Sequence, residues 1–386
     1  MISVSLLGTS QITSRKEMFT CLQRLGLTPI FYEQKHLGEN SNQSIPIYPI
    51  VKDFPPIPFF IFSEFWLTQL IRHKDHGITF TNQISDKALR ASRSKLFFSD
   101  LLEKNNIPCV HRVKITKAPC DILKPGIIVR PDCAYSGKGV KHIARNVSYS
   151  QYLKDVSSEL SGTVKSVMGE RNIQFIEEEF LNGDEYSCDV IISPYGRKVI
   201  RVCYKKVKWI SGYPCAMAYV TIPFPLQMES AILSWCDVLF EQEQDLSFAQ
   251  FDFIKTNDGL YRPIDFSARP GGGLNFLLSC SLPGHNLYAD SVCFAMGKTK
   301  SICNPQPNWA QFSMIADHAG KLKDISINWP YECKTMQNYN IGDKIKKTTL
   351  SSVSARVVSI ISHVDSLADF SCLADNIQKY IKISYD

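Results

Sequence analysis

The order of strand and helix signals along the chain constrains its fold more than any single motif does. Residues 4–7 form a short apolar run, residues 16–25 carry apolar side chains at helical spacing, and residues 28–32 resume as a strand. Gly26 ends the helix that lies between the two strands. Because strand, helix and strand follow in this order, the chain is expected to open with a parallel sheet in an α/β unit.

Two more helices and one strand are predicted in the following stretch. Residues 62–73 and 86–105 show apolar side chains at helical spacing, and residues 78–81 have the composition of a strand. The Asn-Asn-Ile-Pro sequence ends the longer helix, because proline disfavours helical geometry in the residue before it.

The middle of the chain is rich in strand signals. Residues 188–207 are predicted to form a hairpin around residues 193–196. A second hairpin is predicted over residues 248–266, with its turn at residues 256–259. That turn contains an Asp-Gly pair, which favours tight hairpin turns. These strands are therefore expected to be antiparallel.

The signals divide the chain into four expected units and predict a mixed fold of the α/β and α+β classes. The units are an N-terminal parallel-sheet unit (1–81), two α+β lobes (82–170 and 171–308) and a small β-rich unit (309–386). The last unit mixes short strands with Pro and Gly and closes with a predicted helix over 367–380.

Composition excludes several classes of protein. Hydrophobic residues make up 44% and charged residues 21% of the chain, which is typical of a globular protein. The net charge of +6 is small and its Lys and Arg residues are scattered, so a small anionic ligand is expected rather than nucleic acid. The apolar stretch 54–71 contains three prolines and Glu64, so no membrane-spanning helix is predicted there.

The thirteen cysteines point to a reducing compartment. Their number is odd and no Cys-x-x-Cys pair occurs, so neither a disulfide framework nor a zinc site is expected. Reduced thiols are typical of cytosolic proteins. The first residues show no basic leader before their apolar run, so no secretory signal is predicted. We therefore expect a cytoplasmic protein that does not bind membranes.

A polar, glycine-rich loop at residues 132–140 follows a predicted strand at residues 127–130. Small residues leave backbone N–H groups free to wrap phosphate oxygens, because no Cβ blocks a close approach. The loop lacks the GxxxxGK[ST] spacing of a Walker A loop, since Gly139 follows Lys138. On these residues alone, a phosphate-binding loop and a plain β-turn are equally supported.

An acidic cluster inside an apolar frame spans residues 175–185. A segment that crosses between lobes can offer backbone groups to an adenine edge, and a carboxylate such as that of Glu185 can accept from ribose hydroxyls. The alternative is a solvated acidic strand end. The basic strand 198–208 is interpreted as solvated and is left outside the candidate site.

Asp252 and Asp265 fall on the two strands of the second predicted hairpin, so they can lie side by side. Two carboxylates about 4 Å apart repel by roughly 4 kcal/mol at an effective dielectric constant of 20. A divalent cation between them removes that repulsion, and oxygen ligands favour Mg²⁺. The alternative is a pair of turn-forming residues without a metal.

Glycine loop, acidic segment and paired aspartates, in this order, resemble the ATP-grasp superfamily over residues 82–300. The resemblance implies an ATP-grasp fold with the parallel-sheet unit in front and the β-rich unit behind. It implies ATP binding by Lys95, Arg130, Ser136, Gly137, Gly139, Glu178, Glu179, Leu181 and Glu185. It further implies Mg²⁺ ligation by Asp252, Asp265 and Ser267, and catalytic roles for Arg130 and Arg269.

The implied roles differ within the ATP-binding set. Ser136 and the two glycines would cover the triphosphate, and Glu185 would bind ribose. Adenine would be contacted by Glu178, Glu179 and Leu181, the last two through their main chain. The chain departs from the superfamily pattern at three positions. Arg130 stands where most members have Lys, Asp265 where Glu is usual, and Ser267 where Asn is usual. The two shorter side chains leave open whether one or two metal ions bind.

The run Asp265-x-Ser267-x-Arg269-x-Gly-Gly most resembles the L-amino-acid (dipeptide) ligases. This implies a carboxylate–amine ligase that uses ATP with Mg²⁺ or Mn²⁺, phosphorylates a small carboxylate to an acyl phosphate and joins it to an amine. Dimers are common in the superfamily, so a homodimer is a further expectation. The alternatives are a bicarbonate-phosphorylating enzyme, which Arg130 suggests, and an ATP-binding protein without catalytic activity, which Asp265 and Ser267 suggest.

Overall fold

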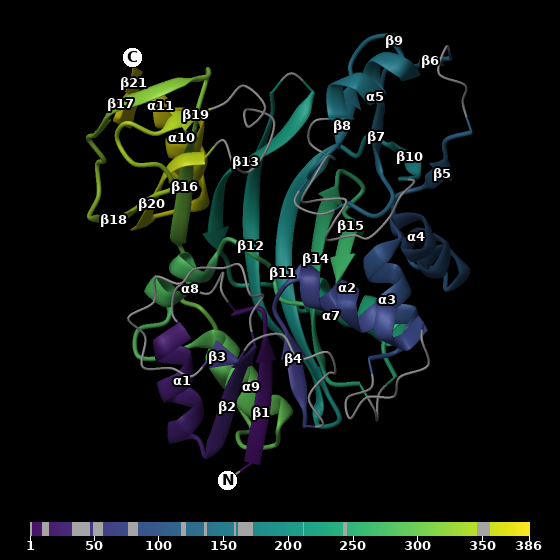
Figure 1. The fold of residues 1–386 in the computed structure, drawn as a ribbon, viewed down its shortest axis with the longest axis vertical. Helices are drawn as coiled ribbons and strands as arrows, with labels where there is room; N and C mark the ends of the chain where they lie inside the picture. The colour runs from purple at the N-terminus through teal and green to yellow at the C-terminus, as the bar shows by residue number, and fades with distance from the viewer. Residues whose placement is uncertain are drawn as a thin grey trace.

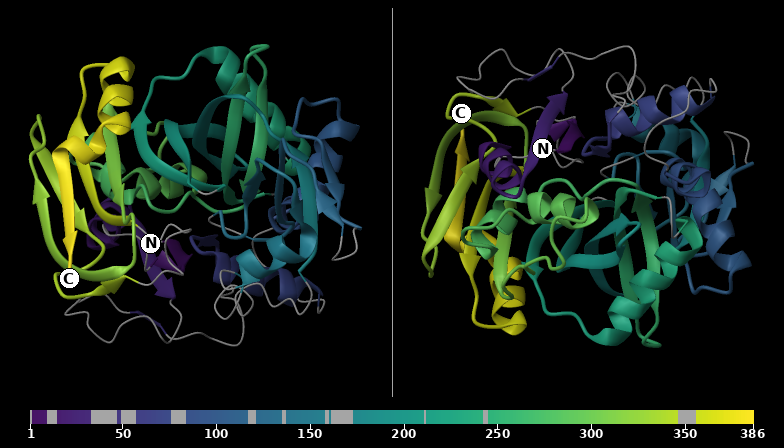
Figure 2. Two further views of the ribbon diagram at one scale, coloured as in Figure 1. Left: turned by 90° about the horizontal axis from the view of Figure 1, so that it is seen from above. Right: turned by 90° about the horizontal axis from the view of Figure 1, so that it is seen from below.

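The computed structural model shows a chain built around one large antiparallel sheet, with smaller sheets on either side of it (Figures 1 and 2). The residues that the structure describes are 2–9, 15–32, 47–48, 57–75, 84–116, 121–134, 137–157, 160, 173–210, 212–241, 245–345 and 356–386. The predicted strand over 78–81 and the predicted ATP ligand Ser136 lie outside these residues.

The N-terminal sheet is parallel, as the sequence predicts. Its elements are β1 (Ile2–Leu7), α1 (Arg15–Arg24), β2 (Leu27–Tyr32), β3 (Ile47–Tyr48) and β4 (Phe59–Ile61). The strand order is β3-β2-β1-β4, with parallel pairing throughout. Helix α2 (Glu64–Asp75) follows β4 after two residues, which places its first turn at the end of the sheet.

The long helix predicted over 86–105 is wrong, because the structure has two helices there. These are α3 (Asp86–Arg93) and α4 (Lys95–Lys104), separated by Ser94 in an extended conformation. The Ser94 hydroxyl accepts a hydrogen bond from the Phe97 amide at 3.0 Å and so caps the second helix. Lys95 thereby becomes the first residue of α4, and its backbone N–H reaches the Asp132 carbonyl.

A small antiparallel sheet with the order β5-β10-β7-β8 carries the glycine loop. Its strands are β5 (Arg112–Lys114), β7 (Ile127–Pro131), β8 (Lys141–Ile143) and β10 (Phe175–Glu179). Helix α5 (Tyr149–Ser157) and the pair β6 (Ile122–Leu123) and β9 (Val147–Ser148) complete this lobe. Val129 and Tyr152 are fully buried in its own core cluster.

The large sheet has the strand order β15-β14-β11-β12-β13-β16-β20-β18. Its strands are β11 (Gly183–Ser193), β12 (Gly196–Ile210), β13 (Tyr213–Thr221), β14 (Ser247–Thr256), β15 (Tyr261–Ser267), β16 (Trp309–Ile315), β18 (Cys333–Gln337) and β20 (Arg356–His363). Both predicted hairpins are confirmed, since β11 pairs with β12 and β14 with β15 in antiparallel fashion. Strand β16 pairs with β13, so the sheet continues across the expected unit boundary at residue 308.

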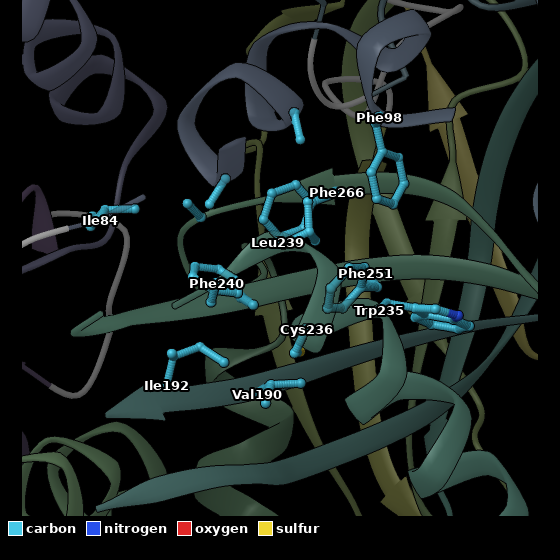
Figure 3. Close-up of a cluster of buried hydrophobic side chains, with 14 of the residues drawn as sticks. Ile84, Phe98, Val190, Ile192, Trp235, Cys236, Leu239, Phe240, Phe251 and Phe266 are labelled. Atoms are coloured by element: carbon cyan, nitrogen blue, oxygen red, sulfur yellow. The ribbon is translucent and has the colours of Figure 1, made fainter. Parts of the chain in front are cut away.

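Helices cover both faces of this sheet. Helix α7 (Leu226–Leu239) lies against one face, where Trp235 and Phe251 are fully buried (Figure 3). Helices α8 (Asn275–Ser281) and α9 (Leu287–Ala295) belong to a second buried cluster, which also includes side chains of β1 and β2. The second cluster therefore joins the N-terminal sheet to the large sheet.

The C-terminal part adds a three-stranded sheet, β19-β17-β21. Its strands are β17 (Gly320–Ile327), β19 (Lys344–Ile345) and β21 (Ile381–Tyr385). The predicted closing helix is interrupted at Asn376, which separates α10 (Leu367–Asp375) from α11 (Ile377–Tyr380), and a strand follows it. Among the described residues, no helix has both the length and the apolar character needed to cross a membrane.

Candidate active site

A cavity of about 920 Å³ lies where the small sheet, the large sheet and the N-terminal part of the chain meet. Eleven of the predicted site residues line it, and they come from five strands, one helix and the loops between them. These residues are Lys95, Arg130, Gly137, Glu178, Glu179, Leu181, Glu185, Asp252, Asp265, Ser267 and Arg269. The fold therefore brings together side chains that the sequence separates by more than 150 positions.

The glycine loop turns at two residues with left-handed backbone geometry. Gly137 has φ +70° and lines the cavity, whereas Gly139 has φ +73° and does not. A Cβ on Gly139 would lie 2.8 Å from Pro131, and the Gly139 carbonyl accepts a hydrogen bond from the Tyr152 hydroxyl at 2.8 Å. Gly139 therefore fastens the loop to its lobe, and Gly137 faces the space where a ligand would lie.

Buried Lys95 and partly exposed Asp265 form an ion pair, with 3.3 Å between Nζ and Oδ1. Lys95 also donates to the Ala134 carbonyl at 2.7 Å, so the ammonium is held beside the glycine loop. Burial lowers the pKa of Lys95, and Asp265 offsets only part of that effect. Burial also opposes the ionisation of Asp265, yet Lys95 and Arg130 hold the pKa of its carboxyl below the usual value.

Glu178 holds two arginine side chains, only one of which the sequence analysis found. Its carboxylate accepts from Arg112 Nε at 2.7 Å and from Arg130 Nη1 at 3.3 Å, and all three side chains are buried. Arg130 Nη2 reaches Asp265 at 3.3 Å, which links this group to the Lys95 pair. Arg112 was missed because its partner Glu178 lies opposite it on β10, a pairing 66 residues apart.

The segment between β10 and β11 runs along the cavity. Leu181 lines the cavity, and the ring of Phe180 beside it stacks on His142 with 4.3 Å between ring centroids. Trp209 packs against both rings. Glu179 directs its carboxylate away, since Oε1 accepts from the His111 amide at 3.3 Å. The main chain of this segment is therefore held in place by the packing of Phe180 against His142 and Trp209 and by the contact of Glu179 with the His111 amide.

Lys205 lies between two predicted carboxylate ligands, and the sequence analysis missed it. Its Nζ contacts the Glu185 carboxylate and lies 3.1 Å from Asp252 Oδ2. Although burial opposes the charge, Asp252 and Glu185 raise the pKa of Lys205. Gln250 Nε2 donates to the second oxygen of Asp252 at 3.0 Å.

The interpretation of the basic strand 198–208 as solvated is therefore wrong. Arg201 in the same strand is 1% exposed and forms an ion pair with buried Asp189 at 2.7 Å. A β-bulge leaves Ile200 unpaired, because Asp189 pairs with Arg201 and Val190 pairs with Val199. Arg201 and Lys205 both follow the bulge and share one face of β12, whereas the bulge moves Val199 to the opposite face. Alternation places the two cations on one face but does not show that this face is the inner one.

The two aspartates fit a divalent cation. Asp252 and Asp265 are directly opposite each other in the β14–β15 register, and both line the cavity. Two carboxylates that share an ion with substrate phosphates are a common arrangement for Mg²⁺. The Ser267 hydroxyl instead lies 3.4 Å from Glu64 Oε1. The described side chains therefore offer two carboxylate ligands here, and the hydroxyl of Ser267 is turned towards Glu64.

Arg269 is fixed by a residue that no local pattern could reveal. Its guanidinium contacts Glu64 through Nε at 2.7 Å and Nη2 at 2.5 Å, and the two residues are 205 positions apart. Glu64 begins α2, next to the N-terminal sheet. Burial opposes the charge of Arg269, yet Glu64 raises its pKa. The N-terminal unit thus takes part in the candidate site directly.

The floor of the cavity beside Arg269 is the run Gly271 to Gly273. The Gly271 amide donates to Asp189 Oδ1 at 2.8 Å. A Cβ on Gly271 would lie 2.3 Å from Arg201 Nη2, so the buried Asp189–Arg201 pair leaves no room for a side chain. The Asp189–Arg201 pair therefore fixes the position of the Gly271 backbone, which lines the cavity.

Arg356, from β20, lines the same part of the cavity and was not predicted. It is 9% exposed, and its Nη2 donates to the Ala216 carbonyl at 3.3 Å. No carboxylate of the described residues forms an ion pair with it. We use "glycine end" for Glu64, Ser267, Arg269, Gly271 to Gly273 and Arg356. We use "nucleotide end" for Lys95, Arg112, Arg130, Gly137, Glu178, Glu185, Lys205, Asp252 and Asp265.

Comparison with known proteins supports an ATP-binding fold. Residues 123–274 match the family model described as an ATP-grasp domain. The nucleotide-end residues from Arg130 to Asp265 fall inside this match, and Lys95 and Arg112 precede it. No curated protein matches the chain in sequence.

Solved structures match over the whole chain. An L-amino acid ligase from Bacillus licheniformis superposes with a TM-score of 0.71 at 14% identity, covering 100% of this chain and 99% of that one. The N5-carboxyaminoimidazole ribonucleotide synthetase from Thermotoga maritima gives 0.63 at 11% identity, with 100% of both chains covered. The biotin carboxylase domain of the Hydrogenobacter thermophilus 2-oxoglutarate carboxylase, in complex with MgADP and bicarbonate, gives 0.61 at 11% identity, covering 100% and 91%.

These identities are low, so the likeness concerns the fold. Residues 123–274 match the ATP-grasp domain model, and the overall fold of the chain is the ATP-grasp fold that these ligase and carboxylase structures share. The predicted fold class is thereby confirmed. The individual roles given above to the site residues stay predictions, which their positions in the cavity make testable.

Proposed function

We propose that this ATP-grasp chain is an ATP-dependent ligase that phosphorylates a small carboxylate and couples it to an amine, with release of ADP and phosphate. The observation that carries the proposal is a cavity with two chemically different ends. One end gathers Lys95, Arg130 and Lys205 beside two carboxylates, and the other presents Arg269 over a glycine floor. Cations, carboxylates and open backbone in one space suit phosphoryl transfer to a bound acid.

At the nucleotide end, Lys95 and Arg130 are proposed to hold the phosphates. Both are buried and are already oriented by Asp265, so little side-chain freedom is lost when ATP binds. Bound by Asp252 and Asp265, Mg²⁺ would neutralise phosphate charge. The main chain at Leu181 is proposed to contact adenine, and Glu185 the ribose.

At the glycine end, Arg269 is proposed to stabilise the charge that develops when a carboxylate oxygen attacks the γ-phosphorus. Glu64 orients the Arg269 guanidinium by accepting a hydrogen bond from its Nε. That attack on the γ-phosphorus displaces ADP and gives the acyl phosphate. The amine then attacks the acyl carbon, the bond between that carbon and the phosphate oxygen breaks, phosphate leaves, and the nitrogen loses a proton. The absence of side chains at Gly272 and Gly273 lets the acid lie against the backbone.

Arg356 is proposed to bind a second carboxylate on one of the substrates. A guanidinium that is 9% exposed and lacks an ion pair with any described residue is costly to keep buried. An anionic group in the cavity would offset this cost, and a bidentate carboxylate matches the planar donors of arginine. An α-amino acid used as the amine substrate carries such a group, which favours amino acids as substrates.

A second candidate function is the phosphorylation of bicarbonate. The solved carboxylase structure that shares this fold contains bicarbonate, and Arg130 here suggests the same substrate. The Glu64–Arg269 pair and Arg356 favour a larger organic acid instead. Among the described residues Arg356 contacts the Ala216 carbonyl and the Tyr219 ring but no carboxylate, and bicarbonate bound beside Arg269 would not supply one to it.

Phosphorus NMR of Mg·ATP with the full chain tests the proposal. Three samples are compared: no addition, a pool of L-amino acids, and bicarbonate. We expect ADP and phosphate only with the pool. Stimulation by bicarbonate alone would support the second candidate, AMP and pyrophosphate would contradict phosphorylation of the acid, and an absence of turnover with ATP binding intact would favour a catalytically silent protein.

Two variants of helix α4 serve as a matched control. Lys95→Met removes the buried ammonium, and Lys104→Met removes an exposed one in the last turn of the same helix. We expect the first to abolish turnover and the second to preserve it. Thermal melting of both variants shows whether a loss of turnover comes from unfolding.

A further inference from the structure

Three reactive side chains lie together outside the cavity, around helix α9. His285 precedes the helix, Asp290 lies in its first turn, and Cys303 follows in the loop beyond it. His285 Nδ1 lies 3.1 Å from Asp290 Oδ2, and His285 Nε2 lies 3.8 Å from Cys303 Sγ. Cys303 is exposed and Asp290 is buried, so the group runs from the surface inwards.

The backbone holds this arrangement from both sides. Asn286 caps α9, because its side chain accepts from the Ala289 amide at 3.0 Å, and its carbonyl accepts from the Asp290 amide. On the other side, Ile302 is buried in a core cluster, and its carbonyl accepts from Lys198 Nζ at 3.4 Å. Asp290 and Cys303, which lie on either side of the imidazole, are therefore held by different elements. Asp290 belongs to the capped helix α9, and the residue before Cys303 contacts Lys198 of β12.

One ligand atom from each of the three residues lies within 4.8 Å of the other two, so a shared metal ion is the competing assignment, which the Zn²⁺ experiment below tests. Asp290 contacts Nδ1 and Cys303 contacts Nε2, and these two nitrogens point away from each other across the ring. The order thiol, imidazole, carboxylate is instead that of a nucleophile, its base and the group that orients the base.

We propose that Cys303 is an activated thiol that attacks small disulfides, with His285 as its base and Asp290 as the positioning residue. Cys303 gives its proton to His285, and its sulfur attacks one sulfur of the disulfide. The sulfur–sulfur bond of that reagent breaks, a mixed disulfide forms on Cys303, and the departing thiolate takes the proton from His285. None of the three side chains lines the large cavity, so this site is separate from the proposed ligase site.

Other titratable groups around the cluster do not compete for this role. On α1 they are Glu17, Cys21 and Arg24, and beyond Asp290 they are Cys293 and Lys298. Burial raises the pKa of Cys293 to about 12 and also raises that of Cys21, so both thiols stay protonated near neutral pH.

Cys372 provides an internal comparison. It is exposed like Cys303, but the contact made by its sulfur is with the Asn376 amide at 3.9 Å instead of an imidazole. The full chain is treated with iodoacetamide at pH 6 and pH 8, and the alkylation of each cysteine is followed by peptide mass spectrometry. At pH 6 an ordinary thiol is less than about 1% thiolate. We expect Cys303 to react at least about tenfold faster than Cys372 at pH 6, and the two rates to converge at pH 8.

Two variants test the assigned roles. His285→Gln and Asp290→Asn should each bring the Cys303 rate at pH 6 down to that of Cys372, with the Cys372 rate unchanged. Because Asp290 is buried, thermal melting checks that its variant is folded. Equal rates for the two cysteines in the unmodified chain, or a Cys303 rate that Asp290→Asn leaves unchanged, would overturn the proposal.

The disulfide reaction itself is tested with oxidised glutathione at pH 7. We expect one glutathionyl group on Cys303, reversed by dithiothreitol, before Cys372 is modified. A Cys303 rate that rises on treatment with a chelator, or Zn²⁺ bound by the purified chain and lost in His285→Gln, would show a metal site and overturn the proposal. Failure of this reaction leaves the ligase assay unaffected, so the two proposals are tested independently.

Discussion

At the nucleotide end of the cavity, the side chains of Lys95, Arg112, Arg130 and Lys205 all contact a carboxylate, whereas Arg356 at the glycine end forms no ion pair with a described residue. At the nucleotide end, each of these four cations is therefore paired with a carboxylate before a ligand binds. At the glycine end, Arg356 is buried without a carboxylate partner among the described residues. The difference indicates that the nucleotide end is preorganised for one ligand, while the glycine end depends on its substrate for charge balance.

The two ends also differ in how they are assembled. Hairpins and neighbouring strands supply most nucleotide-end contacts, such as Glu185 opposite Lys205 and Asp252 opposite Asp265. The glycine end combines the start of α2, the segment after β15 and the first residue of β20. Its geometry therefore depends on how whole units pack, and changes there should affect the acid and the amine more than ATP.

Removal of one member of the buried pair under the glycine floor should have the largest effect. Asp189→Asn leaves Arg201 without its carboxylate at 1% exposure, which costs about 3–5 kcal/mol of unfolding free energy. Asp237→Asn is the matched control, because it breaks a surface pair with Arg197 of the same strand and should cost at most about 1 kcal/mol. Urea unfolding measures both. Equal losses would mean that the floor does not depend on this pair.

The nucleotide end should respond through turnover. Asp265→Asn removes a cavity carboxylate that Lys95 and Arg130 contact, and we expect ATP turnover to fall by about 10²–10³-fold. Asp258→Asn, at the exposed turn of the same hairpin, should leave turnover unchanged. The comparison requires that both variants melt within a few degrees of the unmodified chain. A similar loss in both would remove the case for a metal ligand at Asp265.

Glu64→Gln tests whether the N-terminal unit orients Arg269. The variant keeps the shape of the side chain but weakens a charge-assisted contact of 2.7 Å. We expect turnover to fall by about 10-fold to 100-fold, of the order of 1.5–3 kcal/mol, with the ATP dissociation constant unchanged. Calorimetry with a non-hydrolysable ATP analogue measures the latter. Weaker ATP binding would mean that the two ends are not separable.

Arg356→Lys should have the smallest of these effects. A lysine keeps the charge but loses the bidentate geometry, so the KM for a carboxylate-bearing amine should rise by about tenfold. The same variant should not change the KM for the corresponding amino-acid amide. An equal change for both amines would show that Arg356 supports the fold and does not contact a substrate carboxylate.

Much of the nucleotide end could be predicted from the sequence because its parts are local. The glycine loop, the acidic segment and the Asp252–Asp265 hairpin each lie within a short stretch, and their order gave the resemblance. The roles of Arg112 and Lys205 were not predicted, because the register of the strands determines which residues lie opposite them. A simple alternation cannot include the bulge at Ile200.

The glycine end was only partly predictable. Arg269 and Ser267 follow from the motif, but Glu64 and Arg356 reach the cavity through contacts between distant parts of the chain. The break at Ser94 has a similar origin, since the Asp132 loop accepts the first backbone N–H of α4 and replaces a helical partner. Apolar periodicity does not record such tertiary hydrogen bonds.

Isotope transfer from the acid to phosphate tests most directly whether the two ends act as one site. A pool of L-amino acids with ¹⁸O in the carboxylate is incubated with Mg·ATP and the full chain, and the phosphate released is examined by ³¹P NMR. We predict that each phosphate carries one ¹⁸O from the acid, because an acyl phosphate forms and the amine then displaces it. Phosphate without ¹⁸O, or ¹⁸O found in AMP, would contradict the account.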